Sequence, residues 1–357
     1  MGGGPSSGRA VAPLNTATAA NGTGVFVLAP QDQWKLTAAQ EREWAVWGDF
    51  FVSRLKTCPF GSGLDDEPEF TPLGIGSCFA CVRATLEVHQ WPAELPEELQ
   101  VGLWRRSGEV IDAFTRFSCG TANASRIAFQ LDDGLSFTFT ENMSNFILAD
   151  EVYFRLFYNL SYSKGTTLTA MLNPNNWPRI RAMLAFKNEG GERSQRQQVL
   201  SHPYYSMTPY RCGPGCVKYA LRPKHPTIPF VGEDMATNRP FMREHIRHHA
   251  LEYELCIQVA RDPVAHPIED ALVVWDEDIS PYVPVATLRI PAQDPDALNE
   301  VQNLMAFHSV GDKTPPEHAA LGTINMIRNY LYKQLAPVRI SHVHGLEHAT
   351  PLKCPFH

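Results

Sequence analysis

The stretch GTINMIRNYLYKQLAP, residues 322–337, contains two residue types whose spacing could support chemistry. Arg328 precedes Tyr332 by four residues, so in a helix the two side chains lie on one face, a turn apart. The neighbouring Tyr330 has Met326 in the corresponding place. A surface cation–π contact is the simpler interpretation, because such contacts are common. The alternative is a phenolate that a permanent cation keeps ionised as a metal ligand.

A second group has the residue types of a zinc site. His245 and His249 are four residues apart, with Glu252 nearby. Such a pair could bind zinc, but no third ligand has a suitable spacing and the region is rich in charge. A solvated or strand-edge role is therefore favoured for these side chains.

Two cysteine pairs could also form a zinc site. Cys78 and Cys81 have the spacing of a zinc knuckle, and Cys212 and Cys216 are one residue further apart. Because the surrounding residues alternate as in strands, buried free cysteines are the favoured interpretation.

The chain that must position these residues has 357 residues, of which 44% are hydrophobic. It can therefore bury a substantial core. The net charge of −7, with basic residues scattered, gives no electrostatic footprint for nucleic acid. No apolar run is long enough to span a membrane, and without an export signal a cytoplasmic location is expected. Residues 1–24 have the composition of a flexible tail, and residues 25–357 are expected to form a single domain.

Hydrophobic patterns predict the elements of this domain. Helical spacing predicts helices over 37–57, 300–311 and 321–337. Alternation in CVRATLEVH predicts a strand over 81–89 with one buried face. Further strands are predicted within 110–120, 125–133, 135–144, 216–223, 249–261 and 283–293. Strands in two clusters, with helices between and after them, favour an α+β fold, and antiparallel strands of similar spacing would close into a barrel.

Four segments, in the same order along the chain, resemble the catalase superfamily. They are LQVGLWRRSGEVIDAFTRFSCG, YYSMTPYRCGPGCVKYALRP, HPIEDALVVWDEDISPYVPVATLRIP and HAALGTINMIRNYLY. The resemblance runs from about residue 72 to residue 345. It is closer to the small catalase-like haem proteins, including allene oxide synthase, than to full-length catalases. It implies an antiparallel barrel of about eight strands with flanking helices, and haem b with ferric iron as the cofactor.

The resemblance assigns the proximal side of a haem site. Tyr332 matches the tyrosine whose phenolate ligates the iron, and Arg328 matches the arginine that pairs with this phenolate. Arg339, seven residues after Tyr332, matches an arginine that contacts a haem propionate. A free phenol has a pKa of about 10, so a phenolate ligand depends on neighbouring positive charge. Arginine is suited to this role because it does not lose its proton.

The resemblance also assigns residues on the other side of the haem. Arg116 in TRFS matches a propionate-binding arginine, and Arg126 matches the arginine of a conserved turn of the family. Asn142 aligns with the distal asparagine, a catalytic residue of the family. Phe146 keeps one of the aromatic residues that follow this asparagine, and a cofactor-binding role is implied.

The sequence departs from the family pattern at the distal histidine. The aligned stretch TPLGIGSCFACVRATLEV contains no histidine, and Ile75 or Gly76 occupies the aligned place. Cleavage of hydrogen peroxide needs a base, and Asn142 can form hydrogen bonds but cannot be that base. Loss of a general acid–base typically costs a factor of about 10² to 10⁴, so efficient catalase activity is not expected. Cys78, Ser77 or Thr71 could supply a replacement proton donor.

Three functions follow from these observations. The first is a haem enzyme acting on an organic substrate, by hydroperoxide rearrangement or dehydration or by peroxide-dependent oxidation, in specialised metabolism. The second is a peroxide-degrading catalase or peroxidase with a base from elsewhere, His89 being the nearest histidine. The third is a non-catalytic scaffold, which the retention of Tyr332, Arg328, Arg339 and Arg116 disfavours. No nucleic-acid partner and no membrane span are expected. Catalase relatives commonly self-associate, so a homo-oligomer is compatible with the resemblance, which leaves the oligomeric state open.

Overall fold

The computed structural model describes residues 26–28, 35–57, 77–119, 125–141, 144–146, 150–152, 154–156, 172–178, 180–181, 199–224, 226, 228, 235–295, 298 and 314–344. Its longer helices are α1 (Ala38–Thr57), α5 (Met235–His248) and α6 (Thr323–His344). Short 3-10 helices cover Glu97–Leu99, Gly102–Arg105, Pro174–Asn176, Val199–Ser201 and Pro316–His318. The predicted tail at 1–24 and the predicted helix at 300–311 lie outside the described residues.

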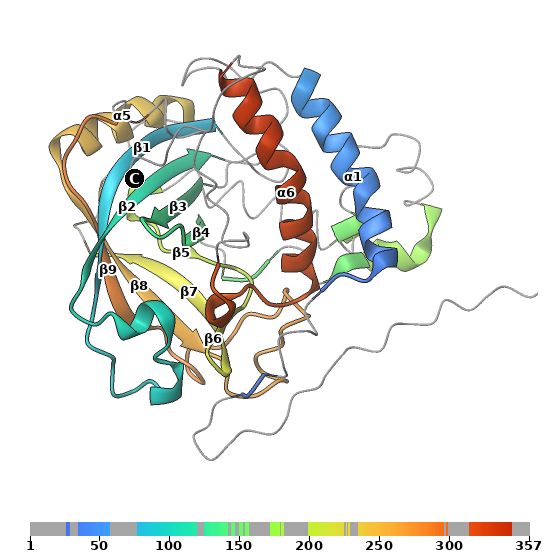
Figure 1. The fold of residues 1–357 in the computed structure, drawn as a ribbon, viewed down its shortest axis with the longest axis horizontal. Coiled ribbons are helices and arrows are strands. Elements are labelled where there is room, and N and C mark those ends of the chain that lie inside the picture. The colour runs from blue at the N-terminus through green and yellow to red at the C-terminus, as the bar shows by residue number, and fades with distance from the viewer. Residues whose placement is uncertain are drawn as a thin grey trace, which may run out of the picture.

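Nine strands form one antiparallel sheet that closes on itself (Figure 1). They are β1 (Ser77–Val88), β2 (Val110–Cys119), β3 (Ser125–Leu131), β4 (Ser136–Glu141), β5 (Tyr204–Tyr205), β6 (Tyr210–Cys212), β7 (Gly215–Pro223), β8 (Leu251–Val259) and β9 (Val283–Ile290). The order is β5-β4-β3-β2-β1-β9-β8-β7, and the pairing of β5 with β7 closes the ring, while β6 pairs only with β7. The predicted α+β fold with an antiparallel barrel of about eight strands is confirmed.

The barrel interior is filled by the apolar residues of the alternating strands. The predicted buried face of β1 is present, since Val82, Leu86 and Val88 are at most 1% exposed. Phe129 of β3 and Phe137 of β4 stack at 4.9 Å in the same core. Residues between these positions therefore lie on the outer face of the barrel.

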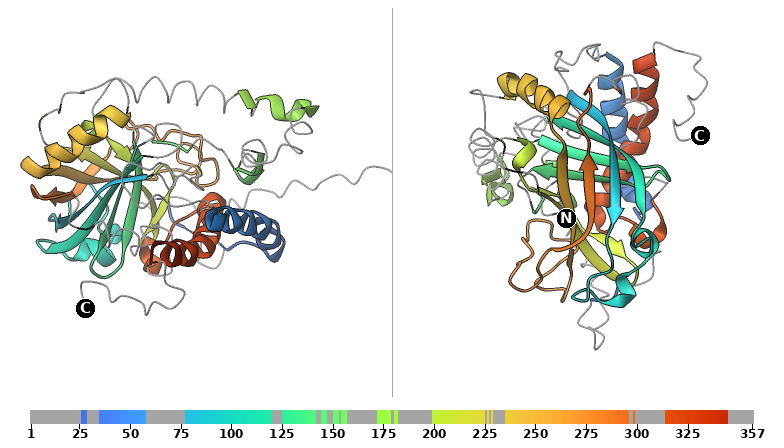
Figure 2. Two further views of the ribbon diagram at one scale, coloured as in Figure 1. Left: turned by 90° about the horizontal axis from the view of Figure 1, so that it is seen from above. Right: turned by 90° about the vertical axis from the view of Figure 1, so that its left-hand side faces the viewer.

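Two helices lie side by side against one side of the barrel (Figures 1 and 2). Trp44 and Phe51 of α1, both fully buried, form an apolar cluster with Ile327, Leu331 and Leu335 of α6. Both helices were predicted, and α6 continues beyond the predicted end at 337 to His344. Within the described residues, no helix combines the length and the hydropathy of a membrane span.

The helix α5 was not predicted from the sequence. It contains Pro240, a residue that disfavours helix interiors, and it ends in a run of charged residues and histidines. Its buried residues Met242 and Ile246, four positions apart, pack against the main core. The packing of these two side chains against the core therefore stabilises the helix, although the local sequence pattern favours a helix only weakly.

Candidate functional site

The two tyrosines of α6 lie on different faces of the helix. Tyr332 packs against the barrel core, whereas Tyr330 packs in the cluster between α6 and α1. The guanidinium carbon of Arg328 lies 5.9 Å from the centroid of the Tyr332 ring. Arg328 is only 7% exposed, so this contact is not a surface cation–π pair. The structure thus brings Arg328 and Tyr332 together on the face of α6 that meets the barrel.

A buried hydrogen-bond network fixes the guanidinium of Arg328. Its Nη1 donates to Asn325 Oδ1 at 3.0 Å and to Thr208 Oγ1 at 3.3 Å. The Thr208 hydroxyl donates to the same Asn325 Oδ1 at 3.0 Å. These acceptors are neutral oxygens, so they orient Arg328 without neutralising its charge.

The Asn325 amide extends the network to the backbone around it. Its Nδ2 donates to Pro209 O at 3.1 Å and to Leu321 O at 2.8 Å. The Leu321 amide in turn donates to Pro209 O at 3.0 Å, and the Arg211 amide donates to Ala319 O at 2.7 Å. The segment 206–213 is thus joined to the start of α6, which unites two of the motifs that carry the catalase resemblance.

A third motif supports the same end of α6. Both carboxylate oxygens of Glu269 accept from the Thr323 amide, at 3.3 Å and 3.1 Å. A carboxylate at a helix N-terminus is favoured by the helix dipole, although burial raises the pKa of Glu269. Gly322 has a φ of +85°, and a Cβ there would lie 3.0 Å from Ile268 O. The residues 268–269 therefore fix where α6 begins.

Two predicted arginines share the outer face of the barrel. Arg116 of β2 pairs with Ala128 of β3, and Ser118 pairs with Arg126, so Arg116 and Arg126 are diagonal neighbours on one face. The intervening Phe117 points into the core. Figure 1 shows the end of β2 and the start of β3 on the side of the barrel nearest α6. Two neighbouring guanidiniums are suited to binding anionic groups.

The structure describes only some of the remaining predicted site residues. Phe146 packs in the cluster between α1 and α6, with its ring 5.9 Å from that of Phe154. Arg339 lies in α6, nearly two turns beyond Tyr332, but its side chain is outside the described part. Asn142 and the stretch 58–76, which includes the place of the missing distal histidine, are also outside it.

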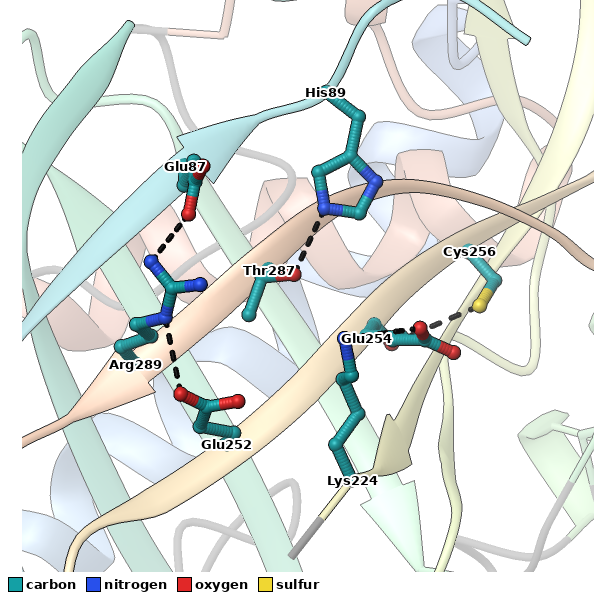
Figure 3. Close-up of polar contacts among 8 residues, drawn as sticks. All are labelled: Glu87, His89, Lys224, Glu252, Glu254, Cys256, Thr287 and Arg289. Atoms are coloured by element: carbon teal, nitrogen blue, oxygen red, sulfur yellow. Dashed lines mark hydrogen bonds and ion pairs between the residues drawn. The ribbon is translucent and has the colours of Figure 1, made fainter. Parts of the chain in front are cut away.

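His89 follows the end of β1, among the polar side chains that Figure 3 shows, whereas the predicted distal position precedes the start of this strand in the sequence. The strand has 12 residues, and at about 3.3 Å per residue its two ends are about 36 Å apart. His89 Nε2 contacts Thr287 Oγ1 at 2.8 Å, and burial lowers the pKa of His89. Beside it, Arg289 pairs with Glu87 and, at 3.0 Å, with Glu252. His89 therefore belongs to a polar network on β1, β8 and β9 and cannot replace a histidine at the start of β1.

The candidate zinc residues show other arrangements. The His245 and His249 rings stack at 4.5 Å at the end of α5. Cys212 and Cys216 are buried free cysteines, and burial raises the pKa of Cys212 to about 12. In the part of the chain that the structure describes, no three or more histidine, cysteine and acidic side chains gather as a metal site. The Cys78 side chain lies outside that part.

No role was assigned from the sequence to Thr208 or Asn325. Each lies inside a motif used for the resemblance, and Asn325 stands three residues before Arg328, on the same helix face. That spacing was the available signal for Asn325. The position of Thr208 beside Arg328 depends on a contact 120 residues apart in the sequence, which no local pattern reveals.

No model of a known protein family matches the chain, and no curated protein matches it significantly. Among solved structures 92 chains match, and one of them is a bacterial catalase. It is similar with a TM-score of 0.53 and 14% sequence identity, over 77% of this chain. The chain spans 59% of the length of that catalase. This likeness shows a catalase-like fold, and it does not distinguish the small catalase-like haem proteins from larger catalases.

Proposed function

We propose that the chain is a haem-dependent enzyme in which Tyr332 ligates ferric iron and the substrate is an organic molecule. The observation that carries the proposal is the buried Arg328 guanidinium, 5.9 Å from the Tyr332 ring and oriented by Asn325 and Thr208. A fixed positive charge there complements the negative charge that a tyrosine oxygen carries when it ligates a metal. An ordinary core contact does not need a buried cation there, because burying a charge is costly.

The donor set of the structure fits a haem group. A phenol is a known axial ligand of haem iron, and Tyr332 is on the face of α6 that meets the barrel. Arg116 and Arg126, together on the outer face of the barrel, are suited to the two propionates, with Arg339 as a third candidate. When bound, the haem would supply a Lewis-acidic iron that can accept and return electrons.

The other roles belong to residues of this chain. Arg328 holds a positive charge beside the Tyr332 ring, and Asn325 and Thr208 keep its guanidinium in place. Asn142 is proposed to hydrogen-bond a substrate oxygen on the distal side. The resemblance proposes Phe146 as a cofactor contact, but its side chain packs in the cluster between α1 and α6, on the face of α6 that carries Tyr330.

An organic substrate is favoured over hydrogen peroxide alone. Peroxide dismutation needs a distal base, and the aligned place holds Ile75 or Gly76. His89, the alternative base, follows the end of β1 and is about 40 Å of extended chain from the start of that strand. A hydroperoxide that rearranges or loses water fits a distal side without a base, whereas oxidation of a substrate at the expense of peroxide would need a replacement proton donor such as Cys78, Ser77 or Thr71. The setting would be specialised metabolism.

The optical spectrum of the purified protein tests this proposal, with Tyr332→Phe and Tyr330→Phe as a matched pair. The proposal expects a ferric Soret band that Tyr332→Phe abolishes and Tyr330→Phe retains, because Tyr330 faces α1. An unchanged spectrum in Tyr332→Phe would refute the ligand assignment. A protein that is colourless and does not take up added haem would instead be a scaffold that retains the fold. Vigorous oxygen evolution with hydrogen peroxide would support a catalase.

A further inference from the structure

The chain makes a strained turn at Met207, between β5 and β6. Among the residues that the structure describes, Met207 is the one non-glycine residue with a positive φ, at +61°. Residues with a side chain rarely adopt this left-handed conformation, because the Cβ comes close to the backbone. Such a turn persists only where the surrounding contacts hold it, and strained turns of this kind gather at functional sites. The contacts around Met207 therefore indicate what the turn does.

The turn lies in a bulge between β5 and β6, which both pair with β7. The pairs on either side of it are Tyr205 with Ala220 and Tyr210 with Val217. Four residues, 206–209, therefore lie opposite two residues of β7. Extra residues on one strand bend it and redirect its side chains, and bulges are frequent beside active sites.

The Ser206 hydroxyl holds this turn. In a regular antiparallel sheet, two residues of a hydrogen-bonded pair exchange both backbone hydrogen bonds. The Ser206 amide does donate to Tyr219 O at 2.9 Å, but the Tyr219 amide donates to Ser206 Oγ at 3.0 Å. Ser206 O is thereby released, and it accepts from the Thr208 amide at 2.7 Å, which closes a three-residue turn around Met207. The same hydroxyl donates to Thr208 O at 3.0 Å, so one buried side chain holds both ends of the turn.

The turn determines where the Thr208 hydroxyl lies. Thr208 Oγ1 donates to Asn325 Oδ1 at 3.0 Å and accepts from Arg328 Nη1 at 3.3 Å. It also lies 3.4 Å from Ser206 O, within the turn itself. All four of these side chains are buried. Described contacts thus run from Ser206, through Thr208, to the guanidinium beside the Tyr332 ring.

We propose that Ser206 is a positioning residue for Arg328. Its hydroxyl stabilises the positive φ at Met207, and the turn places the Thr208 hydroxyl against the guanidinium. This inference rests on the proposed function, because the place of Arg328 affects the chemistry only if Tyr332 ligates the iron. The alternative is a local role, in which the Ser206 hydroxyl only satisfies the backbone amide of Tyr219.

Hydrogen exchange in the haem-free, full-length protein tests the link from Ser206 to Arg328. Ser206→Ala removes the hydroxyl. Ser280→Ala is the matched control, because Ser280 is 1% exposed and its hydroxyl donates to Val259 O at 2.6 Å, outside the turn. We expect Ser206→Ala to speed exchange of the Thr208 amide and of the Arg328 guanidinium protons by about tenfold or more, and Ser280→Ala to leave both unchanged. Ser206→Thr keeps the hydroxyl and should retain the wild-type rates.

The exchange data separate the two roles of the hydroxyl. Faster exchange of the Tyr219 amide in Ser206→Ala, with unchanged exchange of the Arg328 protons, would show the local role and overturn the inference. If Ser206→Ala does not fold, Ser206→Cys takes its place, because a thiol has a similar shape and is a weaker acceptor. The same two outcomes then decide.

A haem titration tests the functional part. We expect Ser206→Ala to weaken haem binding by about tenfold in the wild-type background and to change it little in Arg328→Met, where the guanidinium is already absent. Additive effects of the two substitutions would overturn the role of Ser206 at Arg328. A protein that takes up no haem refutes the proposed function and this role together, whereas haem uptake that Tyr332→Phe abolishes and Ser206→Ala leaves unchanged refutes only the role of Ser206.

Discussion

Replacing Arg328 by methionine removes a buried positive charge beside Tyr332 and keeps most of the side-chain volume. The guanidinium carbon is 5.9 Å from the ring centroid. With the distance to the ring centroid taken as the scale of the separation, two opposite unit charges about 6 Å apart in an effective dielectric of about 20 attract each other by about 2.8 kcal/mol. That energy corresponds to about a hundredfold in an equilibrium constant. We therefore expect Arg328→Met to weaken ferric haem binding by up to about a hundredfold.

The same substitution is expected to change the stability of the haem-free fold much less. Arg328 loses hydrogen bonds to Asn325 and Thr208, each worth about 1.5–3 kcal/mol for a charged donor. The loss is offset because methionine does not require desolvation of a charge, and Asn325 Oδ1 keeps the Thr208 hydroxyl as a donor. In Arg328→Met the haem affinity should therefore fall strongly, while the free energy of unfolding of the haem-free protein changes much less.

The assay is a competitive haem titration followed at the Soret band, paired with urea unfolding of the haem-free protein. Arg328→Lys is the matched control, because lysine keeps the charge and loses the planar fork of donors. We expect Arg328→Lys to retain haem affinity within about tenfold of wild type. If Arg328→Met binds haem as tightly as Arg328→Lys does, the charge does not support the ligand and the reasoning is wrong.

Three further predictions concern single residues. Thr208→Val removes a buried hydroxyl that serves both Asn325 and Arg328, and urea unfolding should show a loss of about 1–3 kcal/mol; an unchanged midpoint would contradict the network. His318 is 2% exposed and burial lowers its pKa from 6.5 to about 4, so the unfolded chain binds the extra proton and stability falls as the pH drops from 6.5 to 4. That loss approaches about 3 kcal/mol in wild type and should be smaller in His318→Gln when unfolding is followed across this pH range. Ile75→His should raise oxygen evolution from hydrogen peroxide without changing haem content, and no gain there or in Gly76→His would mean that the start of β1 is misaligned.

Much of the fold followed from local patterns. Alternation in β1 correctly assigned Val82, Leu86 and Val88 to the core, because a strand with one buried face repeats every two residues. The pairing of β5 with β7, which closes the barrel, could not be predicted, since two residues carry no periodic signal. The helix α5 was missed for a related reason, because Pro240 and a charged end hide a pattern that depends on packing.

Part of the candidate site was likewise predictable from local patterns, and part was not. The i, i+4 spacing predicted that Arg328 and Tyr332 would share a face, and the structure confirms it. Spacing could not show that Arg328 is buried, because its burial depends on Thr208, which lies 120 residues away in the sequence. The turn at Met207 is equally invisible in the sequence, since methionine rarely adopts a positive φ and the Tyr219 amide, which bonds the Ser206 hydroxyl, lies 13 residues after Ser206.

The described contacts join Arg328 to Thr208 and Asn325, and Glu269 holds the first turn of α6. We propose that this network keeps the orientation of Arg328 when the aligned histidine position changes. Loss of a distal base would then alter the chemistry and leave the proposed iron ligand in place, which is what a change from peroxide to an organic substrate requires.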